Sequence, residues 1–277
     1  MNDLANHYRQ ENLDDQIKCA LDSVINDHKD FDPNIIAAMD QFHIGGAQAT
    51  RDMLELAQFT LGDRVLDIGC GIGGPARLIA QVCQSPTIGL DLSMDYCLAA
   101  NLISDQLNVS DQTGFVQGNA IHLPFADNSF DGIWTQHVTM NIENKVMLFS
   151  EFTRVLKPGG KLVMYEVFLS SDNTKPPHYP LPWSVEGAHS FLDTPDSHRR
   201  IMDTHHFSIT HFDCVSTSAL LSVNQLLQRF QQNRLNKPNL GILLCEHYRS
   251  MMENLSSALT QDVLQVFQII AQKSEDR

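Results

Sequence analysis

The residues best suited to chemistry begin with a carboxylate that is followed by a cluster of glycines. Asp67 closes a short apolar run, and four glycines follow it between positions 69 and 74 in the stretch LDIGCGIGG. A glycine-rich loop between a strand and a helix lets backbone N–H groups approach a bound ligand closely. Three kinds of ligand fit such a loop: a dinucleotide, a nucleoside triphosphate, or a molecule without phosphate.

Charge and spacing separate these ligands. Gly69, Gly71 and Gly74 fit the G-x-G-x-x-G pattern of dinucleotide-binding loops, and Asp91 at the end of the next expected strand fits ribose hydroxyls. Asp67, however, would repel a pyrophosphate and attract a cation, and the chain lacks the G-x-x-x-x-G-K-[ST] loop of triphosphate binders. S-adenosylmethionine (SAM) carries an ammonium group, a ribose and an adenine but no phosphate, so it fits better. A tight turn without any ligand is the remaining alternative.

An alternation of strands and helices must position this loop. Apolar runs predict strands at 64–69, 87–93, 114–120, 130–136, 161–169, 207–216 and 263–270. Apolar residues at helical spacing predict helices at 75–83, 94–107 and 144–156, the second capped by Ser93. This alternation is typical of an α/β fold with an open parallel sheet and helices on both faces. Such sheets bind ligands beyond the carboxyl ends of their strands, where Asp67 and Asp91 are expected.

Four longer stretches resemble a known family. VLDIGCGIGGPARLIA, GLDLS, GNAIHLPFADNSFDGIW and RVLKPGGKLVMYE are similar, in order and spacing, to the motifs of class I SAM-dependent methyltransferases. That resemblance covers roughly residues 60–170. DQFHIGGAQAT, WTQHVTMNIENK and HYPLPW further resemble the sarcosine/dimethylglycine N-methyltransferase-like group. The resemblance implies a Rossmann-like, mostly parallel sheet of seven strands in the order 3-2-1-4-5-7-6, and transfer of a methyl group to a small-molecule amine.

Domain organisation follows from the segments around these motifs. Residues 1–60 are interpreted as an N-terminal helical cap, and residues 61–277 as the SAM-binding methyltransferase core. Residues 170–192, after the fifth strand, are proline-rich and too long for a plain connection, which predicts an ordered lid. Two amphipathic patterns within about 218–260 predict a helical insertion.

The resemblance also implies which residues hold the cofactor. The methionine part of SAM would lie against the glycine loop, the ribose against Asp91, and the adenine near Leu92 and the segment after the third strand. The implied residues are Asp67, Gly69, Cys70, Gly71, Gly73, Asp91, Leu92, Asn119, Ala120 and Gln136. The family more often has Asp where this chain has Asn119, whose amide oxygen can still accept from the adenine amino group.

The methyl acceptor would meet a second set of side chains. His137 at the tip of the fourth strand is the leading candidate for a general base, with an orienting hydrogen-bond role as the alternative. His43 is the second candidate for a base, and its alternative is packing at a helix entry. A base is needed only if the acceptor must lose a proton. The implied acceptor-contacting residues are Tyr8, Asn141, His178, Tyr179 and Trp183, for which packing is the alternative.

The identity of the acceptor stays open between several classes. A carboxylate such as that of sarcosine is best held by arginine, yet the only cation in the lid is Lys175. The candidate clamps lie outside the lid and are Arg9, Arg51, Arg199 and Arg200. The alternatives are O- or C-methylation of a lipid or natural product, which HYPLPW and the late amphipathic helices would suit, and a non-catalytic SAM-binding module. A NAD-dependent oxidoreductase would need a second catalytic half, which the sequence does not suggest.

Composition sets the remaining expectations. The net charge of −14 over 277 residues argues against nucleic acid as the main partner. The six cysteines have no CxxC spacing, and the loose set His205, His206, His211 and Cys214 lacks a second cluster, so no metal is expected. The polar N-terminus does not read as a secretory signal, and no apolar run would span a membrane. A cytoplasmic enzyme that acts on a small molecule is therefore expected, and a homodimer is considered.

Overall fold

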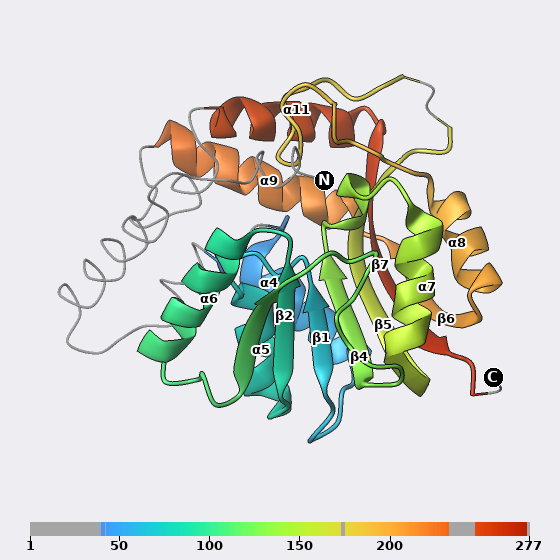
Figure 1. Ribbon diagram of the computed structural model, residues 1–277. Coiled ribbons are helices and arrows are strands. Elements are labelled where there is room, and N and C mark those ends of the chain that lie inside the picture. Colours follow the sequence, from blue (N-terminus) through green and yellow to red (C-terminus); the bar gives the residue numbers. More distant parts are fainter. Residues whose placement is uncertain (1–39, 42, 173–174, 233–246, 276–277) are drawn as a thin grey trace.

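Short apolar runs form the strands of the fold, and amphipathic stretches form the helices between them (Figure 1). The structure is a computed structural model that describes residues 40–41, 43–172, 175–232 and 247–275. The strands are β1 (Val65–Ile68), β2 (Thr87–Asp91), β3 (Thr113–Gln117), β4 (Phe130–Gln136), β5 (Leu156–Leu169), β6 (Phe207–Cys214) and β7 (Leu264–Lys273). The helices are α4 (Gly46–Ala57), α5 (Gly74–Cys83), α6 (Met94–Gln106), η1 (Thr139–Asn141), α7 (Lys145–Val155), α8 (Pro195–Thr204), α9 (Ser216–Gln231) and α11 (Tyr248–Thr260).

All seven strands belong to one sheet with the order β3-β2-β1-β4-β5-β7-β6. β1 to β5 pair in parallel, whereas β7 pairs antiparallel with both β5 and β6. The register sets Asp67 beside Gly89 on β2 and Trp134 on β4, and it sets Gln136 beside Tyr165 on β5. The expected fold class and strand order are confirmed.

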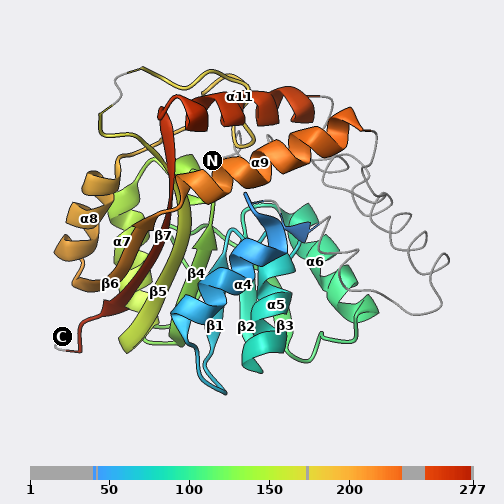
Figure 2. The same cartoon turned by 180° about the vertical axis from the view of Figure 1, so that it is seen from behind.

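Helices cover the sheet on both faces and across one edge. α7 and α8 lie over one face (Figure 1), and α4 and α5 lie over the other (Figure 2). α9 and α11 pack against each other and lie across the edge where β5 ends and β7 begins (Figures 1 and 2). The carboxyl ends of the parallel strands therefore face the segment 43–46, the lid and this helix pair.

Several element boundaries differ from expectation, and one helix was not expected. β3 ends at Gln117 rather than at 120, and β7 continues to Lys273 rather than ending at 270. β5 begins at Leu156, directly after α7, whereas the sequence predicted a break at Pro158–Gly160 and a strand from 161. α8 was not expected, although Thr194 caps it by accepting a hydrogen bond from Ser197 N and Pro195 follows as its first residue. The predicted cap of α6 is confirmed, because the Ser93 hydroxyl accepts from Tyr96 N.

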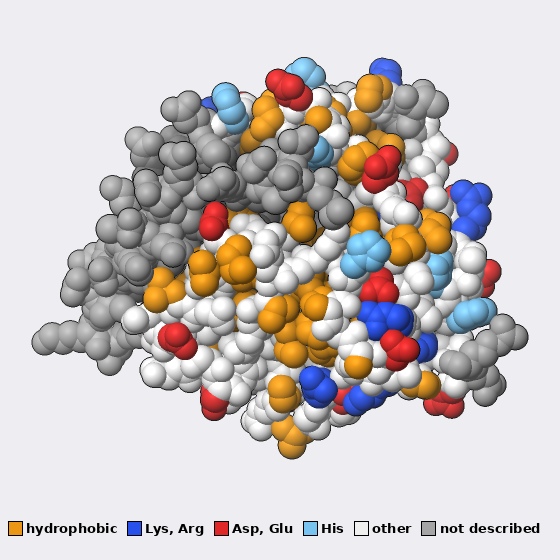
Figure 3. Space-filling model, in the orientation of Figure 1, with side chains coloured by type: hydrophobic (Ala, Val, Ile, Leu, Met, Phe, Trp, Pro, Cys, Tyr) orange, Lys and Arg blue, Asp and Glu red, His pale blue; other side chains and the backbone are white. Residues whose placement is uncertain are grey.

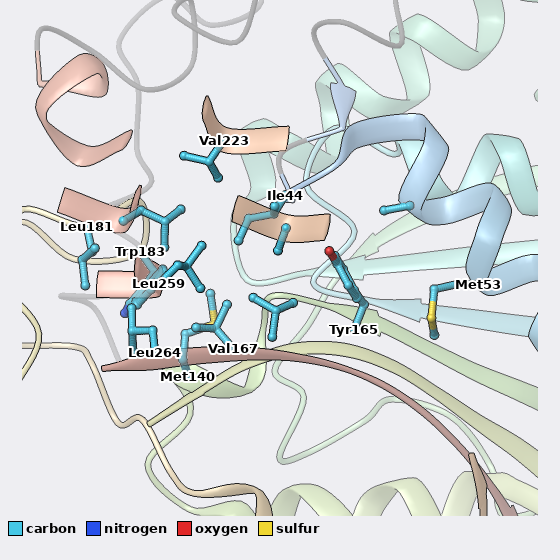
Figure 4. Packing of buried hydrophobic residues seen from close by; sticks show 14 of the residues in the cluster. Ile44, Met53, Met140, Tyr165, Val167, Leu181, Trp183, Val223, Leu259 and Leu264 are labelled. Atoms are coloured by element: carbon cyan, nitrogen blue, oxygen red, sulfur yellow. The ribbon is translucent and has the colours of Figure 1, made fainter. Parts of the chain in front are cut away.

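Two clusters of buried apolar side chains hold the layers together. The first joins α4, β1, β4, β5, the lid, α9, α11 and β7, and Figure 4 shows part of it. The second fills the space between the sheet and the layer formed by α7 and α8. Trp134 is fully buried, at 0% exposure. On the face drawn in Figure 3, lysine and arginine side chains are interspersed with acidic ones.

The proposed units are only partly covered by these residues. Residues 1–39 of the predicted cap, including Tyr8, lie outside the described residues. Leu244, predicted on the second late helix, lies outside them as well. The division into a cap at 1–60 and a core at 61–277 stays a prediction. Within the described ranges, no helix is both long and apolar enough to cross a membrane.

Candidate functional site

The glycine loop owes its shape to backbone conformations that favour glycine. Gly69, Gly71 and Gly73 have φ values of 71°, 53° and 85°. A Cβ at Gly69 would lie 2.4 Å from a methyl carbon of Val138, and one at Gly73 would lie 2.5 Å from the Phe115 ring. Side chains are therefore excluded from both ends of the loop.

Asp67 places a buried carboxylate beside this loop, where the backbone of Ala76 and the charge of Arg77 compensate it only in part. The side chain is buried at 2% exposure, and its Oδ2 atom has no hydrogen-bond partner among the described residues. Burial, and then the charge of Asp91, raise the pKa of Asp67 to about 8. A buried carboxylate in this state is suited to a cationic group and opposes a phosphate.

Asp91 at the end of β2 is tied to the same loop. Its Oδ2 accepts a hydrogen bond from Gly71 N at 3.0 Å, and its Oδ1 accepts from Ser93 N at 2.9 Å. Burial raises the pKa of Asp91, and these backbone donors oppose that rise. Each carboxylate oxygen has a second lone pair, so the group can still accept from two hydroxyls of a ligand.

The segment after β3 lies beside the tip of β2. Gly118 N donates to Asp91 O at 2.8 Å, and Gln117 Nε2 donates to Leu92 O at 3.1 Å. Asn119 uses its Oδ1 to accept from Ile121 N at 3.1 Å, which shapes the turn that follows. Of the other residues implied here, Ala120 and Cys70 are buried and Leu92 is half-buried. The structure thus brings together the residues predicted for the cofactor.

His137 lies at the tip of β4, but both ring nitrogens are engaged. Nδ1 lies 3.0 Å from Tyr165 O, and because a carbonyl can only accept, Nδ1 carries the proton. Nε2 accepts from Ile44 N at 3.2 Å. Burial, and then the proximity of His43, lower the pKa of His137 to about 3. The ring is therefore neutral, and its only lone pair is already used.

His43 has the opposite arrangement. Its Nε2 lies 2.9 Å from Gly46 O, so Nε2 carries the proton in the neutral ring and Nδ1 has the lone pair. The Thr50 hydroxyl lies 3.0 Å from the same Nε2. Burial lowers the pKa of His43 to about 4, so the ring is neutral at physiological pH. His43 rather than His137 thus has a nitrogen suited to accept a proton.

Gln136 connects these histidines to the core. Its Oε1 accepts from Trp134 Nε1 at 2.9 Å and from the Thr50 hydroxyl at 3.2 Å. Its Nε2 is buried and has no partner among the described residues, so this amide donor remains for a ligand. The chain of contacts from His43 through Thr50 to Gln136 spans residues far apart in sequence. It fixes the predicted residue Gln136 at the edge of the sheet.

Tyr165 completes a cluster of three rings at this edge. Its ring stacks on His137 with centroids 5.0 Å apart, and His43 lies edge-on to both rings at 6.1 and 6.2 Å. Figure 4 shows the Tyr165 hydroxyl pointing from β5 toward the side on which Ile44 lies. The sequence prediction missed Tyr165 and Thr50. Tyr165 stands within the quoted motif RVLKPGGKLVMYE, so its position was a usable signal.

The lid is fastened to the edge of the sheet by side chains predicted to contact the acceptor. Asn141 Nδ2 donates to Trp183 O at 3.1 Å and to His189 O at 3.0 Å. Trp183 is buried among apolar residues of the first cluster, and its Nε1 donates to the Ser190 hydroxyl at 2.9 Å. Tyr179 is half-buried. Packing therefore accounts for Trp183, and lid attachment accounts for Asn141.

Other predicted residues lie away from this arrangement. His178 and Arg51 are exposed. Within the ranges that the structure describes, no group of three or more potential ligands forms a metal site. Of the histidines with loose spacing, His205 Nδ1 lies 2.8 Å from Ile201 O in its own helix turn, and His211 faces Asp213 at 3.6 Å.

Known proteins share both the sequence pattern and the fold. Residues 66–164 match the model of the methyltransferase domain family. A sterol 24-C-methyltransferase from Saccharomyces cerevisiae is 38% identical over 128 residues, which are 45% of this chain and 33% of the yeast enzyme. The chain thus spans about a third of the length of that relative.

Solved structures give the same picture for the fold. A phosphoethanolamine N-methyltransferase from Haemonchus contortus, solved with S-adenosylhomocysteine, superposes with a TM-score of 0.72 over 84% of this chain and 54% of that one, at 21% identity. A putative sarcosine dimethylglycine methyltransferase from Galdieria sulphuraria gives a TM-score of 0.66 over 82% of this chain and 85% of that one, at 16% identity. At such low sequence identity, these superpositions show a shared fold and nothing more. The narrower resemblance to sarcosine-type enzymes therefore stays a prediction.

The glycine loop, the unpartnered Asp67 and the family match agree with one another. The donors and acceptors at this edge fit SAM, and the domain match together with neighbours that hold its demethylated product support SAM as the cofactor. Residues 66–164 therefore match a methyltransferase domain, and SAM is the cofactor that fits it.

Proposed function

We propose that this protein transfers a methyl group from SAM to a small-molecule acceptor. One observation carries the proposal: a buried carboxylate, Asp67, has an unpartnered oxygen directly beside a loop of left-handed glycines. A carboxylate left in this way costs free energy unless a cation compensates it. The ammonium group of SAM is such a cation, and a dinucleotide offers a pyrophosphate instead.

The residues around the loop would share the parts of the cofactor. Asp67 would hold the ammonium group, Asp91 the ribose hydroxyls, and Leu92 with Asn119 and Ala120 the adenine. When bound, SAM supplies a methyl group that is already activated by its sulfonium. The protein therefore needs mainly to align the acceptor in line with that methyl group and to exclude water.

The acceptor side is assigned to the ring cluster of His43, His137 and Tyr165. His43 would accept a hydrogen bond or a proton at Nδ1, and Gln136 would donate from its free Nε2. These polar groups suit an acceptor that carries an N–H, because they orient its lone pair. An amine nitrogen is accordingly our first assignment for the acceptor atom. A sarcosine-like molecule is the leading example, because its neutral amine carries both an N–H and a lone pair. A dimethylglycine-like molecule, whose neutral amine has a lone pair but no N–H, stays the alternative within the same group.

A carbon acceptor on an apolar molecule is the second candidate. The similarity to a sterol 24-C-methyltransferase favours it. Figure 4 also shows the buried apolar side chains of Ile44 and Val223 on the side toward which the Tyr165 hydroxyl points. In addition, Lys145 Nζ already donates to the carbonyls of Ile142 and Phe191, so it is engaged rather than placed to hold a carboxylate.

Calorimetry with SAM and NAD tests the cofactor assignment. We expect SAM to bind and NAD not to bind, and binding of NAD alone would contradict the proposal. Mass spectrometry on a panel of sarcosine, dimethylglycine, phosphoethanolamine and an unsaturated sterol then tests the acceptor. Methylation of an amine supports the first assignment, and methylation of the sterol supports the second. Binding of SAM without turnover of any compound points to a non-catalytic module.

A further inference from the structure

Glu166 on β5 is a fully buried carboxylate that no cofactor assignment uses. Its exposure is 0%, and burial raises its pKa. Oε1 accepts from the Thr135 hydroxyl at 2.5 Å. Oε2 accepts from Val138 N at 3.1 Å and from both the backbone N–H and the hydroxyl of Thr139, at 3.1 and 3.0 Å. Its partners therefore lie near the end of β4, at Thr135, and in the turn that follows, at Val138 and Thr139.

This turn also carries the two residues nearest to the proposed reaction. Gln136 and His137 lie between the donors that Glu166 holds. His137 has a φ of 56°, a left-handed conformation that is unfavourable for a residue with a side chain. Its backbone N–H and its Nδ1 both lie within 2.8 to 3.0 Å of Tyr165 O, on the residue before Glu166. Two adjacent residues of β5 thus clamp the turn and maintain this conformation.

The same turn reaches the cofactor loop. Val138, whose backbone N–H is held by Glu166, packs its side chain against Gly69, where a Cβ would lie 2.4 Å from a Val138 methyl carbon. A displacement of Val138 would therefore change the shape of the glycine loop. A displacement of His137 would change the proposed acceptor side. A single carboxylate fixes the spacing between these two regions.

We infer that Glu166 is a positioning residue for methyl transfer, because it sets the geometry between the cofactor loop and the side chains that face the acceptor. The inference rests on the proposed methyltransferase activity. An ionised carboxylate suits this role since it only accepts hydrogen bonds, and all its partners here are donors. Displacement in line is sensitive to alignment, and a misplacement of about 1 Å can cost roughly 100-fold in rate.

Three variants separate positioning from general stability. Glu166→Ala removes every contact to the turn, and we expect kcat to fall about 30- to 100-fold while the Kd for SAM changes less than about fivefold. Glu166→Gln keeps one acceptor oxygen for the Oε2 donors, and its amide can donate to the Thr135 hydroxyl, so it should recover most of kcat. Lys273→Met is the matched control.

Lys273 is a suitable control because it is also a buried, charged side chain with several hydrogen bonds. It donates to Asn128 Oδ1, Thr153 O and Leu156 O near the amino end of β5, away from the turn. We expect Lys273→Met to lower Tm without lowering kcat at 25 °C. If Glu166→Ala lowers Tm to the same extent and leaves kcat within twofold of wild type, the positioning role is wrong.

A readout that needs no acceptor keeps the inference apart from the proposed function. Long-range ¹H–¹⁵N spectra of the histidine rings report which nitrogen carries the proton, and a His137→Gln spectrum assigns the signal. We expect the Nδ1–H form of His137 in wild type, Glu166→Gln and Lys273→Met, and loss or broadening of that form in Glu166→Ala. An unchanged His137 signal in Glu166→Ala would overturn the inference even if no acceptor is found. Failure of wild type to methylate any compound would instead overturn the proposed function.

If Glu166→Ala does not fold, Thr139→Val provides the test. It removes one hydroxyl donor to Oε2 and leaves both backbone donors in place. We expect a fall in kcat of about two- to fivefold with the His137 signal shifted, since one of the contacts that define the turn is lost. Wild-type kcat and an unshifted signal in this variant would count against the role of Glu166.

Discussion

The cofactor edge and the acceptor side of this molecule are built in different ways. At the cofactor edge, Asp67, the glycine loop and Asp91 follow one another within 25 residues, and backbone conformation does most of the shaping. On the acceptor side, His43 and His137 come from segments more than 90 residues apart and meet through side-chain contacts. The first region is formed by residues close together in the sequence. The second is formed by distant residues that tertiary packing brings together.

The two regions also differ in their electrostatic state. Burial, and then the charge of Asp91, raise the pKa of Asp67 to about 8, although Arg77 opposes this rise. Burial lowers the pKa of His43 to about 4 and that of His137 to about 3, so the acceptor side holds neutral rings. We conclude that the cofactor edge is poised to bind charge, whereas the acceptor side is poised to orient an uncharged group.

The largest effect is expected from Asp67→Asn. Loss of a buried charge-assisted contact should weaken SAM binding about 100-fold, because such contacts are worth roughly 3 kcal/mol. The Kd measured by calorimetry checks this. Asp63→Asn is the control, since Asp63 bonds to Thr60 at the start of β1, away from the loop. Equal SAM affinities for wild type and Asp67→Asn would remove the proposed role of this carboxylate.

Asp67 should also give the ligand-free protein a distinctive pH dependence. Its folded pKa of about 8 lies above the unfolded value of 3.8, so the folded state binds the extra proton between these pH values. Stability from this group is fully present below pH 3.8 and is lost as the pH rises through 8. Denaturant titrations should therefore show that Asp67→Asn reduces the decline in unfolding free energy toward pH 8. If the unfolding free energy of Asp67→Asn depends on pH as that of wild type does, the assigned pKa of Asp67 is wrong.

Asp91→Ala should have the second largest effect. The variant loses both proposed ribose contacts and also frees Gly71 N and Ser93 N, so SAM affinity should fall about 30-fold. Asp91→Asn keeps one acceptor oxygen, so its affinity for SAM, measured in the same calorimetric series, should lie between those of Asp91→Ala and wild type. An Asp91→Ala variant with wild-type affinity would show that the ribose lies elsewhere.

On the acceptor side, His43→Gln should change turnover rather than cofactor affinity. Loss of one oriented nitrogen should lower kcat/KM for the acceptor about tenfold, with the SAM Kd unchanged. The exposed His247 serves as the control through His247→Gln. A loss of SAM affinity in His43→Gln equal to the loss in turnover would erase the distinction between the two regions.

The buried histidines His43 and His137 should make stability depend on pH in the direction opposite to Asp67. Their folded pKa values of about 4 and about 3 lie below the unfolded value of 6.5, so the unfolded state binds more protons in this window. The stability that they contribute is present above pH 6.5 and is lost as the pH falls toward 4 and then 3. In denaturant titrations, His43→Gln should reduce the fall in unfolding free energy between pH 6.5 and pH 3. An unchanged fall would count against the burial of the His43 ring.

The smallest effect is expected from Arg51→Ala. Arg51 is exposed on α4, so we expect less than a twofold change in KM for an acceptor such as sarcosine. Steady-state kinetics with sarcosine checks this expectation. A large rise in KM would instead identify Arg51 as a carboxylate clamp and would support the sarcosine-type acceptor.

The difference between the regions explains what the sequence predicts. Glycines with left-handed φ and a carboxylate at a strand tip leave a local pattern, so Asp67, Gly71 and Asp91 were predicted correctly as neighbours. The strand order was confirmed as well. His43 contacts Thr50, and Thr50 in turn contacts Gln136, which lies 86 residues further along the chain. This second contact depends on how distant segments pack, and no spacing rule encodes it.

Residues whose type suits both packing and ligand binding were the hardest to assign from the sequence. Trp183 and Asn141 were predicted to contact the acceptor, but an aromatic ring or an amide near a lid serves equally well for packing or attachment. Glu166 lies inside an apolar strand, where a lone carboxylate is conspicuous in the sequence. Its partners in the turn after β4 become evident only from the parallel pairing of β4 with β5.

The most direct test of the account follows a labelled methyl group. The full chain is incubated with SAM that carries a trideuterated methyl group and with the four-compound acceptor panel, and both products are measured by mass spectrometry. We predict that S-adenosylhomocysteine and one labelled acceptor form in equal amounts, and that Asp67→Asn requires far more SAM to reach the same rate. Tight binding of SAM with neither product formed would contradict the account.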